Sequence, residues 1–574
     1  MTTDTTQPEE PAATNDRGAA ARGKMTWGDR FRWIIWRHLA FGGLAGALVF
    51  FCLSLTPSLL PRVSLLQGAA TGIAIAIGYG LGSAVSSLIR MFMKTEPGAD
   101  TKRIAWWVLL GAAVVLVPLF LYLGRGWQEN VRELMDMPSQ AGWQVLMIIL
   151  VAVAIAYVIL VIARTIRLMT RGLINFADRF IPRTAAVVAG VVVATLLVLG
   201  FVQGFVLDPL VGALNATFSV VNDGTEPGIV QPTNPERSGS PESLVTWESL
   251  GVKGRDFIGT GPSTAEIEDF TGQTAEEPIR VYIGLKSADD VDARVALAME
   301  ELDRTGAWDR DVLTVFTTTG TGWVDARAAD PLEYMHGGDT ASVALQYSYL
   351  PSWISFLVDQ EKAADAGSGM INAVYDRWSQ LPEDSRPRLL LFGESLGSFG
   401  TESAFEDIND MVSKIDGALL VGPVFQNDIH NQVTADREEG TPAWRPVYED
   451  GEHVRFVVSP PDLLEPPTEW APTRVVYLQN ASDPITYWKP DLLFSPPEWL
   501  DDPRGPDVSP DMFWMPIITF LQTAVDMAYS TGVPAGHGHV YGANPVDSWA
   551  AIYTPEGWTD DDTQRLRDII GHEK

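Results

Sequence analysis

One serine of this chain stands in a setting suited to covalent chemistry. Ser395 is the centre of a Gly-Glu-Ser-Leu-Gly run that directly follows an apolar stretch, 389–392, typical of a buried strand. A serine on a sharp turn between a strand and a helix has strained backbone angles, and side chains two residues to either side would clash. Gly393 and Gly397 remove those clashes. The spacing predicts that Ser395 is a nucleophile whose hydroxyl group points into a cleft.

A serine hydroxyl is a poor nucleophile until a base takes its proton, and the base needs an acid to orient it. Asp483 follows the predicted strand 475–478, which is where we expect the orienting carboxylate. His537 and His539 share a glycine-rich loop near the end of the chain, and only seven histidines occur in total. Because they are alternate residues, one should face the serine and the other should not. The sequence leaves the choice open, and its Ala-Gly-His-Gly run favours His537.

The His-Gly-His run also raises the question of a metal site. Zinc is usually held by three or four His, Cys, Asp or Glu side chains, and no third ligand is evident near His537 and His539. The single cysteine, Cys52, lies in an apolar stretch, where we expect it to serve in packing. We therefore expect neither a metal ion nor another cofactor.

Acyl transfer also needs N–H groups that stabilise the negatively charged oxygen of the intermediate. We expect the backbone N–H of Leu396, the residue after the nucleophile, to supply one of them. The loop after the predicted strand 312–317 contains Thr319 and Gly320 and is rich in glycine. It could present the second N–H group, and an ordinary turn between a strand and a helix is the alternative.

The elements that must position these residues alternate between strands and helices. Apolar runs predict strands, and longer amphipathic segments such as 288–305 and 370–381 predict helices between them. Such alternation is typical of a mostly parallel sheet, whose sites lie beyond the carboxyl ends of its strands. The predicted strands cover residues 279–285, 312–317, 341–347, 389–392, 418–421 and 475–478.

Two long insertions, 440–470 and 484–516, interrupt this pattern. They are rich in proline, tryptophan and acidic residues. Insertions of this length between core strands often cover a binding site, so we expect a cap. Its aromatic side chains could form an apolar wall for an acyl group or simply pack within the cap; they include Trp444, Trp470, Trp488, Trp499 and Trp514.

The first third of the chain is predicted to cross a membrane. Five apolar segments are each close to the roughly 20 residues that a membrane-spanning helix needs. They cover residues 39–59, 66–89, 104–123, 143–163 and 184–206. We therefore divide the chain into a disordered cytoplasmic tail (1–30), a transmembrane helical domain (31–210), a linker that leads into the next domain (211–275) and an extracytoplasmic domain (276–574).

Charge predicts the orientation of the spans. Residues 1–206 contain 18 Lys and Arg against 11 Asp and Glu, whereas the rest of the chain contains 23 against 61. The basic residues gather before the first span and in every second loop, and such loops are usually cytoplasmic. The N-terminus should then be cytoplasmic and the acidic domain outside. Nucleic acid is an improbable partner for so acidic a domain, because like charges repel.

Together these runs resemble the actinobacterial α/β-hydrolase membrane proteins over residues 30–570. The residues that carry the resemblance are Ser58-Leu-Leu-Pro-Arg62, Gly393-Glu-Ser-Leu-Gly-Ser398, Gly422-Pro-Val-Phe425, Ser482-Asp-Pro484 and Gly536-His-Gly-His539. The resemblance implies an all-α transmembrane bundle of about five spans, followed by an α/β-hydrolase domain with a mostly parallel sheet and a cap. It says little about the substrate.

The leading hypothesis is a membrane-anchored extracytoplasmic serine hydrolase, similar to an esterase or lipase. It would act through an acyl-enzyme on a lipid or another acylated component of the cell envelope. One alternative keeps the acyl-enzyme but passes the acyl group to a cell-envelope acceptor, which makes the protein an acyltransferase. An alternative of another class is a non-catalytic membrane scaffold or binding protein.

Overall fold

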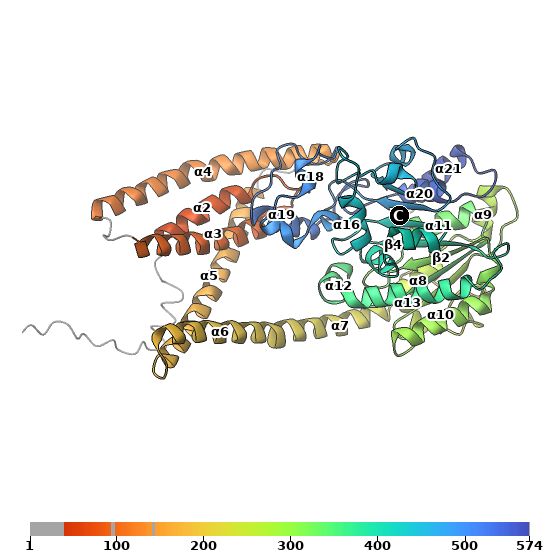
Figure 1. The fold of residues 1–574 in the computed structure, drawn as a ribbon, viewed down its shortest axis with the longest axis horizontal. Helices are drawn as coiled ribbons and strands as arrows, with labels where there is room; N and C mark the ends of the chain where they lie inside the picture. The colour runs from red at the N-terminus through yellow and green to blue at the C-terminus, as the bar shows by residue number, and fades with distance from the viewer. Residues whose placement is uncertain (1–38, 93–97, 140–143, 573–574) are drawn as a thin grey trace, which may run out of the picture.

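The computed structural model of the protein describes residues 39–92, 98–139 and 144–572 (Figure 1). The cytoplasmic tail predicted for residues 1–30 lies outside these ranges. The described chain forms a helical region and an α/β domain that lie end to end. The long helices of the helical region point away from the α/β domain.

Among the described residues, four helices are long and apolar enough to cross a membrane. These are α3 (Ser64–Phe92), α4 (Ala99–Leu134), α5 (Gln144–Ala177) and the continuous helix Arg183–Asn222. The last one comprises α6 (Arg183–Phe201), a π-helical turn (Val202–Leu207) and α7 (Asp208–Asn222). Membrane-like helices are therefore present as predicted, although their number and lengths differ from the prediction.

The first of the five predicted spans is shorter than expected. Segment 39–59 forms only the 14-residue helix α2 (Phe41–Ser54), which packs against α3. Pro57 and Pro61 follow the helix, and a proline disfavours helical angles in the residue before it. The chain between α2 and α3 is therefore irregular. The last predicted span, 184–206, instead continues to Asn222.

The α/β domain is built on seven parallel strands in the order β1-β3-β2-β4-β5-β7-β6. The predicted parallel sheet is therefore confirmed. One strand, β6, falls inside the insertion 440–470 and was not predicted. The strands are β1 (Ile279–Ile283), β2 (Val312–Thr317), β3 (Thr340–Leu345), β4 (Arg388–Glu394), β5 (Gly417–Val421), β6 (Val454–Val457) and β7 (Arg474–Leu478).

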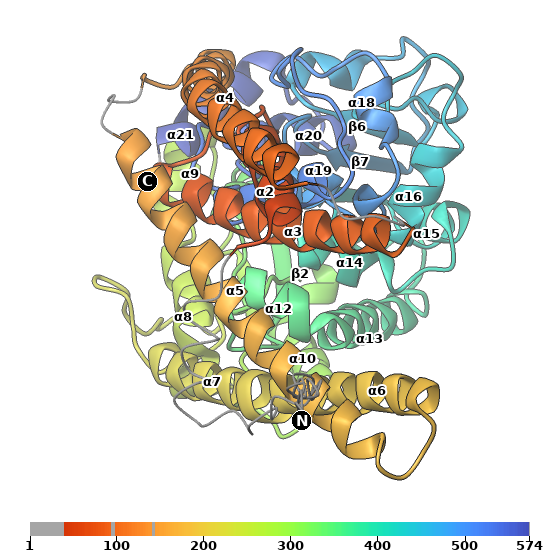
Figure 2. The ribbon, with the colours of Figure 1, turned by 90° about the vertical axis from the view of Figure 1, so that its left-hand side faces the viewer.

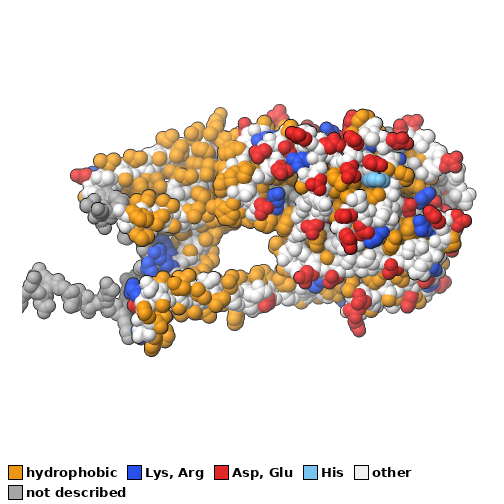
Figure 3. All heavy atoms as spheres, viewed as in Figure 1, with side chains coloured by type: hydrophobic (Ala, Val, Ile, Leu, Met, Phe, Trp, Pro, Cys, Tyr) orange, Lys and Arg blue, Asp and Glu red, His pale blue; other side chains and the backbone are white. Residues whose placement is uncertain are grey.

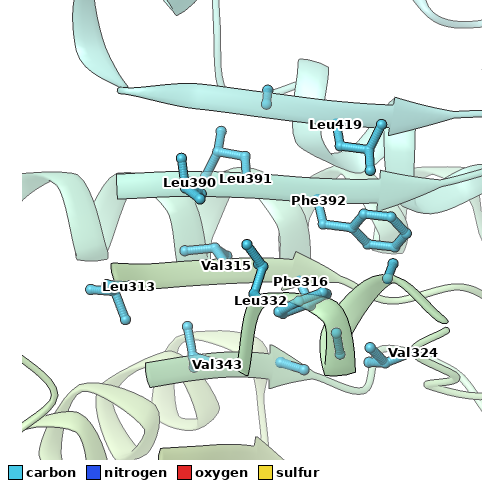
Figure 4. Packing of buried hydrophobic residues seen from close by; sticks show 14 of the residues in the cluster. Leu313, Val315, Phe316, Val324, Leu332, Val343, Leu390, Leu391, Phe392 and Leu419 are labelled. Carbon is cyan, nitrogen blue, oxygen red and sulfur yellow. The ribbon is translucent and has the colours of Figure 1, made fainter. Parts of the chain in front are cut away.

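Helices cover both faces of the sheet, which explains why its strands are mostly apolar and buried along nearly their whole length. On one face α10 (Val291–Thr305) packs beside α13 (Gln360–Trp378). On the other, α11 (Ala326–Met335) packs beside α20 (Asn544–Ile552). Figure 4 shows how the strands contribute to this core, with Phe316 of β2 next to Phe392 of β4. Their ring centroids are 5.4 Å apart.

The segment predicted as a linker, 211–275, carries ordered helices. After α7 come α8 (Gly251–Thr260) and α9 (Thr264–Thr271). Phe257 and Ile258 of α8 are buried in the main core, and α8 contacts β1. Apolar residues at helical spacing therefore attach this segment firmly to the edge of the sheet.

The helical region and the α/β domain share a buried polar interface. The loop between α2 and α3 meets α19 (Ile518–Met527) of the α/β domain. Arg62 Nε lies 2.7 Å from Asp526 Oδ1, and neither side chain is exposed. Gln522 Nε2 donates to the carbonyl oxygen of Thr56 at 2.9 Å. The apolar side chain of Leu60 is fully buried beside this pair. These contacts therefore hold the helical region against the α/β domain.

We expect Arg62→Ala to lower the free energy of unfolding by about 3–5 kcal/mol, because it leaves the buried Asp526 carboxylate without its partner. Urea or thermal unfolding of the detergent-solubilised protein measures the loss. The double variant Arg62→Met/Asp526→Leu removes both charges while keeping apolar volume, so it should recover most of the stability. Equal stability of Arg62→Ala and wild type would contradict the interface.

Candidate active site

Ser395 occupies the turn that joins β4 to α14 (Leu396–Glu402). Its φ of 53° and ψ of −120° are strained for a residue with a side chain. Its backbone N–H donates to the carbonyl oxygen of Val421, at the end of β5, at 2.8 Å. A Cβ at Gly393 would lie 2.5 Å from Gly397 O, and one at Gly397 would lie 2.2 Å from Thr317 O. Both positions therefore require glycine.

Asp483 and His539 form a pair beside this turn. Asp483 follows β7, and its fully buried Oδ2 lies 2.6 Å from His539 Nδ1. The same oxygen accepts a hydrogen bond from the Tyr541 hydroxyl, and Oδ1 accepts one from the N–H of Ile485 at 2.8 Å. Three hydrogen-bonding partners thus fix the orientation of the carboxylate, and the carboxylate in turn orients the imidazole.

The His539 ring lies against Gly422, at the end of the strand that neighbours the turn at Ser395. A Cβ at Gly422, just after β5, would lie 2.4 Å from His539 Cε1. The strand β5 that precedes Gly422 is the one whose last carbonyl binds the N–H of Ser395. The charges of His539 and of Glu394, the residue before Ser395, also influence each other. Asp483, His539 and the turn at Ser395 therefore occupy one end of the sheet.

His537 has a different partner. Its Nδ1 lies 2.9 Å from Oδ2 of Asp507, which also accepts a hydrogen bond from the Ser482 hydroxyl. The N–H of Gly538 in turn donates to Ser482 Oγ at 2.9 Å. The preference for His537 from the sequence is corrected here, because the geometry assigns the Asp483 carboxylate to His539. Asp507 lies in the insertion 484–516, and no local pattern marks it as a partner of the histidine loop.

Two ionisable groups near Ser395 have shifted pKa values. Burial, and then the charge of Asp325, raises the pKa of Glu394 to about 8. Burial alone would lower the pKa of His539, but the charge and hydrogen bond of Asp483, with a contribution from Glu394, outweigh it and raise that pKa above its usual value. The imidazole is therefore a stronger base than an isolated histidine.

We expect the acid limb of kcat/KM to have its midpoint above pH 6.5, because His539 must lose its proton to act as a base. Glu394 has a pKa of about 8 and is therefore largely uncharged at that midpoint, so Glu394→Gln should move the midpoint only slightly toward lower pH. A pH–rate profile of both proteins on a soluble ester measures the shift. A wild-type midpoint at or below pH 6.5 would contradict the raised pKa of His539, and a downward shift of about one pH unit in Glu394→Gln would show that Glu394 carries its charge there.

The proposed N–H donors differ in whether another group already uses them. Leu396 begins α14, and the first N–H groups of a helix have no partner within it. The N–H of Thr319, in contrast, donates to the carbonyl oxygen of Trp323 at 3.2 Å, so the turn itself already uses it. This corrects the expectation for Thr319. Gly320 lies tightly against the chain at 350–352, and its role as a donor stays a prediction.

An apolar cluster surrounds Leu396, the residue after Ser395. Phe356, Leu396 and Val424 are buried together, and Phe425 and Trp488 pack around them. The centroid of the Phe425 ring is 5.7 Å from that of Phe356 and 5.5 Å from that of Trp488. Of the five tryptophans considered for an acyl wall, Trp488 is the one in this cluster.

Two side chains near this cluster hold buried polar atoms that make no hydrogen bond among the described residues. They are the indole N–H of Trp488 and both amide atoms of Gln426. Unpaired buried polar groups are costly, so they are candidates for contacts with a substrate. The sequence pointed to this strand end through its Gly-Pro-Val-Phe run, but it did not single out Gln426 or Phe356. Within the described ranges, no three His, Cys, Asp or Glu side chains gather as a metal site would require.

Two family models match the chain. One, described as the alpha/beta-hydrolase family, matches residues 279–566, and one described as the N-terminus of that family matches residues 55–262. The first covers the sheet with Ser395, Asp483 and His539, and the second covers α3 to α8. No curated protein matches the chain. No solved structure matches it either.

Proposed function

Because the chain belongs to the alpha/beta-hydrolase family, we propose that it is a membrane-anchored serine hydrolase that acts on acyl esters through Ser395. The observation that carries this proposal is the 2.6 Å hydrogen bond between Asp483 and His539, beside the strained turn at Ser395. An acid, a base and a nucleophile at one end of a parallel sheet are the parts that acyl transfer needs.

In the proposed reaction, Ser395 Oγ attacks the ester carbonyl carbon while His539 takes the hydroxyl proton. The negative charge moves to the carbonyl oxygen, where the N–H of Leu396 can stabilise it. The carbon–oxygen bond to the alcohol then breaks, and His539 returns the proton to the departing alcohol. Water attacks the acyl-enzyme by the same route and releases the acid. Asp483 holds the imidazole and stabilises its positive charge throughout.

We also propose that the α/β domain lies outside the cytoplasm. Three arginines, Arg164, Arg167 and Arg171, lie in the half of α5 that is distant from the α/β domain. Figure 3 shows Lys and Arg side chains gathered at that end of the helical region, whereas the α/β domain carries many Asp and Glu side chains. Basic residues favour the cytoplasmic side of a membrane, which supports this orientation.

A fluorophosphonate probe tests the proposed function, because it bonds covalently to an activated serine. We expect the full-length protein in detergent to react, and mass spectrometry of its peptides to locate the label on Ser395. Protein unfolded in urea serves as the control, because it keeps every serine but loses the arrangement around them. Equal labelling of the folded and unfolded protein, or a label on another serine, would contradict the proposal.

A further inference from the structure

The short helix α12 (Ser352–Val358) has two apolar faces with different surroundings. Phe356 is buried, whereas Trp353 and Leu357 are each 66% exposed. Val358 is exposed as well. None of the residues 351–358 is charged, although the domain as a whole is strongly acidic. Single exposed apolar side chains are common, but neighbouring ones that form a patch often mark a surface that binds a protein or a membrane.

The outer face of α12 is directed toward the membrane-like helices. Figure 1 places α12 at the margin of the α/β domain nearest the helical region, and Figure 2, viewed from that region, shows α12 between α3 and the α6–α7 helix. Figure 3 shows an opening in the same place, bordered on its helical sides by hydrophobic side chains. The helix that comprises α6 and α7 carries many exposed apolar side chains along its length, among them Leu196 and Phe205. In a bilayer, an opening between spanning helices is filled by lipid.

The inner face of α12 reaches the candidate active site. Phe356 packs with Leu396, whose N–H is the proposed donor to the reaction intermediate. The centroid of the Phe356 ring lies 6.3 Å from that of the Trp488 ring. One turn of helix therefore separates a surface that faces the spanning helices from the apolar cluster beside Ser395.

We propose that α12 is the place where the ester of a bilayer lipid reaches Ser395 directly from the membrane. This inference rests on the proposed function. The substrate is an ester with a long acyl chain that resides in the bilayer, not a soluble ester. Trp353 and Leu357 rest in the membrane interface, where tryptophan is favoured, and the acyl chain passes along α12 into the cluster of Phe356, Phe425 and Trp488.

The test compares two esters of one fluorescent alcohol, with the full-length protein reconstituted in dioleoylphosphatidylcholine vesicles. Methylumbelliferyl oleate resides in the bilayer, and methylumbelliferyl acetate reaches the enzyme from water. We expect Trp353→Ser/Leu357→Ser to lower the ratio of oleate to acetate cleavage by about tenfold or more. Leu244→Ser is the matched control, because Leu244 is 50% exposed and lies beside α10, and it should keep the wild-type ratio.

A second measurement does not depend on activity. Trp353→Cys, in a Cys52→Ser background, carries an environment-sensitive dye, and doxyl-labelled phosphatidylcholine quenches dyes that touch the bilayer. We expect stronger quenching at position 353 than at a Leu244→Cys control. If wild type cleaves both esters but the ratio and the quenching match the controls, membrane access through α12 is overturned and the hydrolase stands. If wild type cleaves neither ester, the proposed function itself fails.

Discussion

Ser395→Ala is expected to reduce kcat/KM for ester cleavage by about 10⁴- to 10⁶-fold, the size of loss known for nucleophilic serines in triads. Alanine has no oxygen that could attack the carbonyl carbon. No neighbouring residue can replace Ser395, because only Ser395 occupies the strained position of this turn, with φ of 53°. Initial rates on a soluble fluorogenic ester measure the loss. Labelling by a fluorophosphonate should disappear with it.

Ser403→Ala is the matched control for this substitution. Ser403 directly follows α14, is exposed, and only donates a hydrogen bond to Phe399 O at 2.7 Å. Its loss should leave both rate and labelling near the wild-type level. If Ser395→Ala retains more than a tenth of the wild-type rate while Ser403→Ala is normal, the nucleophile lies elsewhere.

The second large effect distinguishes the two histidines. His539→Gln is expected to lower kcat by about 10⁴- to 10⁶-fold, because it removes the base that Asp483 orients. His537→Gln should cost less than about tenfold, since the Asp507 partner of His537 holds the loop and glutamine can still donate a hydrogen bond to it. Steady-state kinetics of the two variants measure both effects.

Each histidine variant controls for the other, because both change the same residue type in one loop. Circular dichroism and thermal unfolding check that both proteins fold. A large loss in His537→Gln together with a mild one in His539→Gln would reverse the assignment of the base.

The comparison of the two histidines shows where prediction from sequence ends. The nucleophile turn was predictable because its cause is local: glycines at 393 and 397 are needed wherever this turn occurs. The choice between His537 and His539 depends on a tight turn in which Gly536 and Gly538 have φ of 86° and 51°. It also depends on Asp507, which lies thirty residues earlier in the chain. No pattern in the loop itself contains that information.

In the helical region, too, features with a local cause were predictable and features that depend on distant residues were not. Hydropathy predicted the membrane-like helices because burial in lipid acts on each helix separately. The end of α2 at Ser54 depends on the prolines that follow it, and the loop after it depends on distant partners. Arg62 pairs with Asp526, 464 residues away, and nothing near either residue indicates the other. The role proposed for the outer face of α12 could not be predicted either. It depends on helices that are distant in the sequence and lie beside α12 only in the folded protein.

The contact between Arg62 and Asp526 also sets an order of assembly. Arg62 precedes Asp526 by 464 residues, so the loop at residues 59–62 is synthesised long before its partner in α19. Leu60 contacts the histidine loop, since a Cβ at Gly538 would lie 3.4 Å from its side chain. A half-made chain, or one without the loop between α2 and α3, therefore lacks part of the support for the loop that holds His539. For the proposed hydrolase, the histidine loop would therefore be fully supported only after the loop between α2 and α3 has met α19.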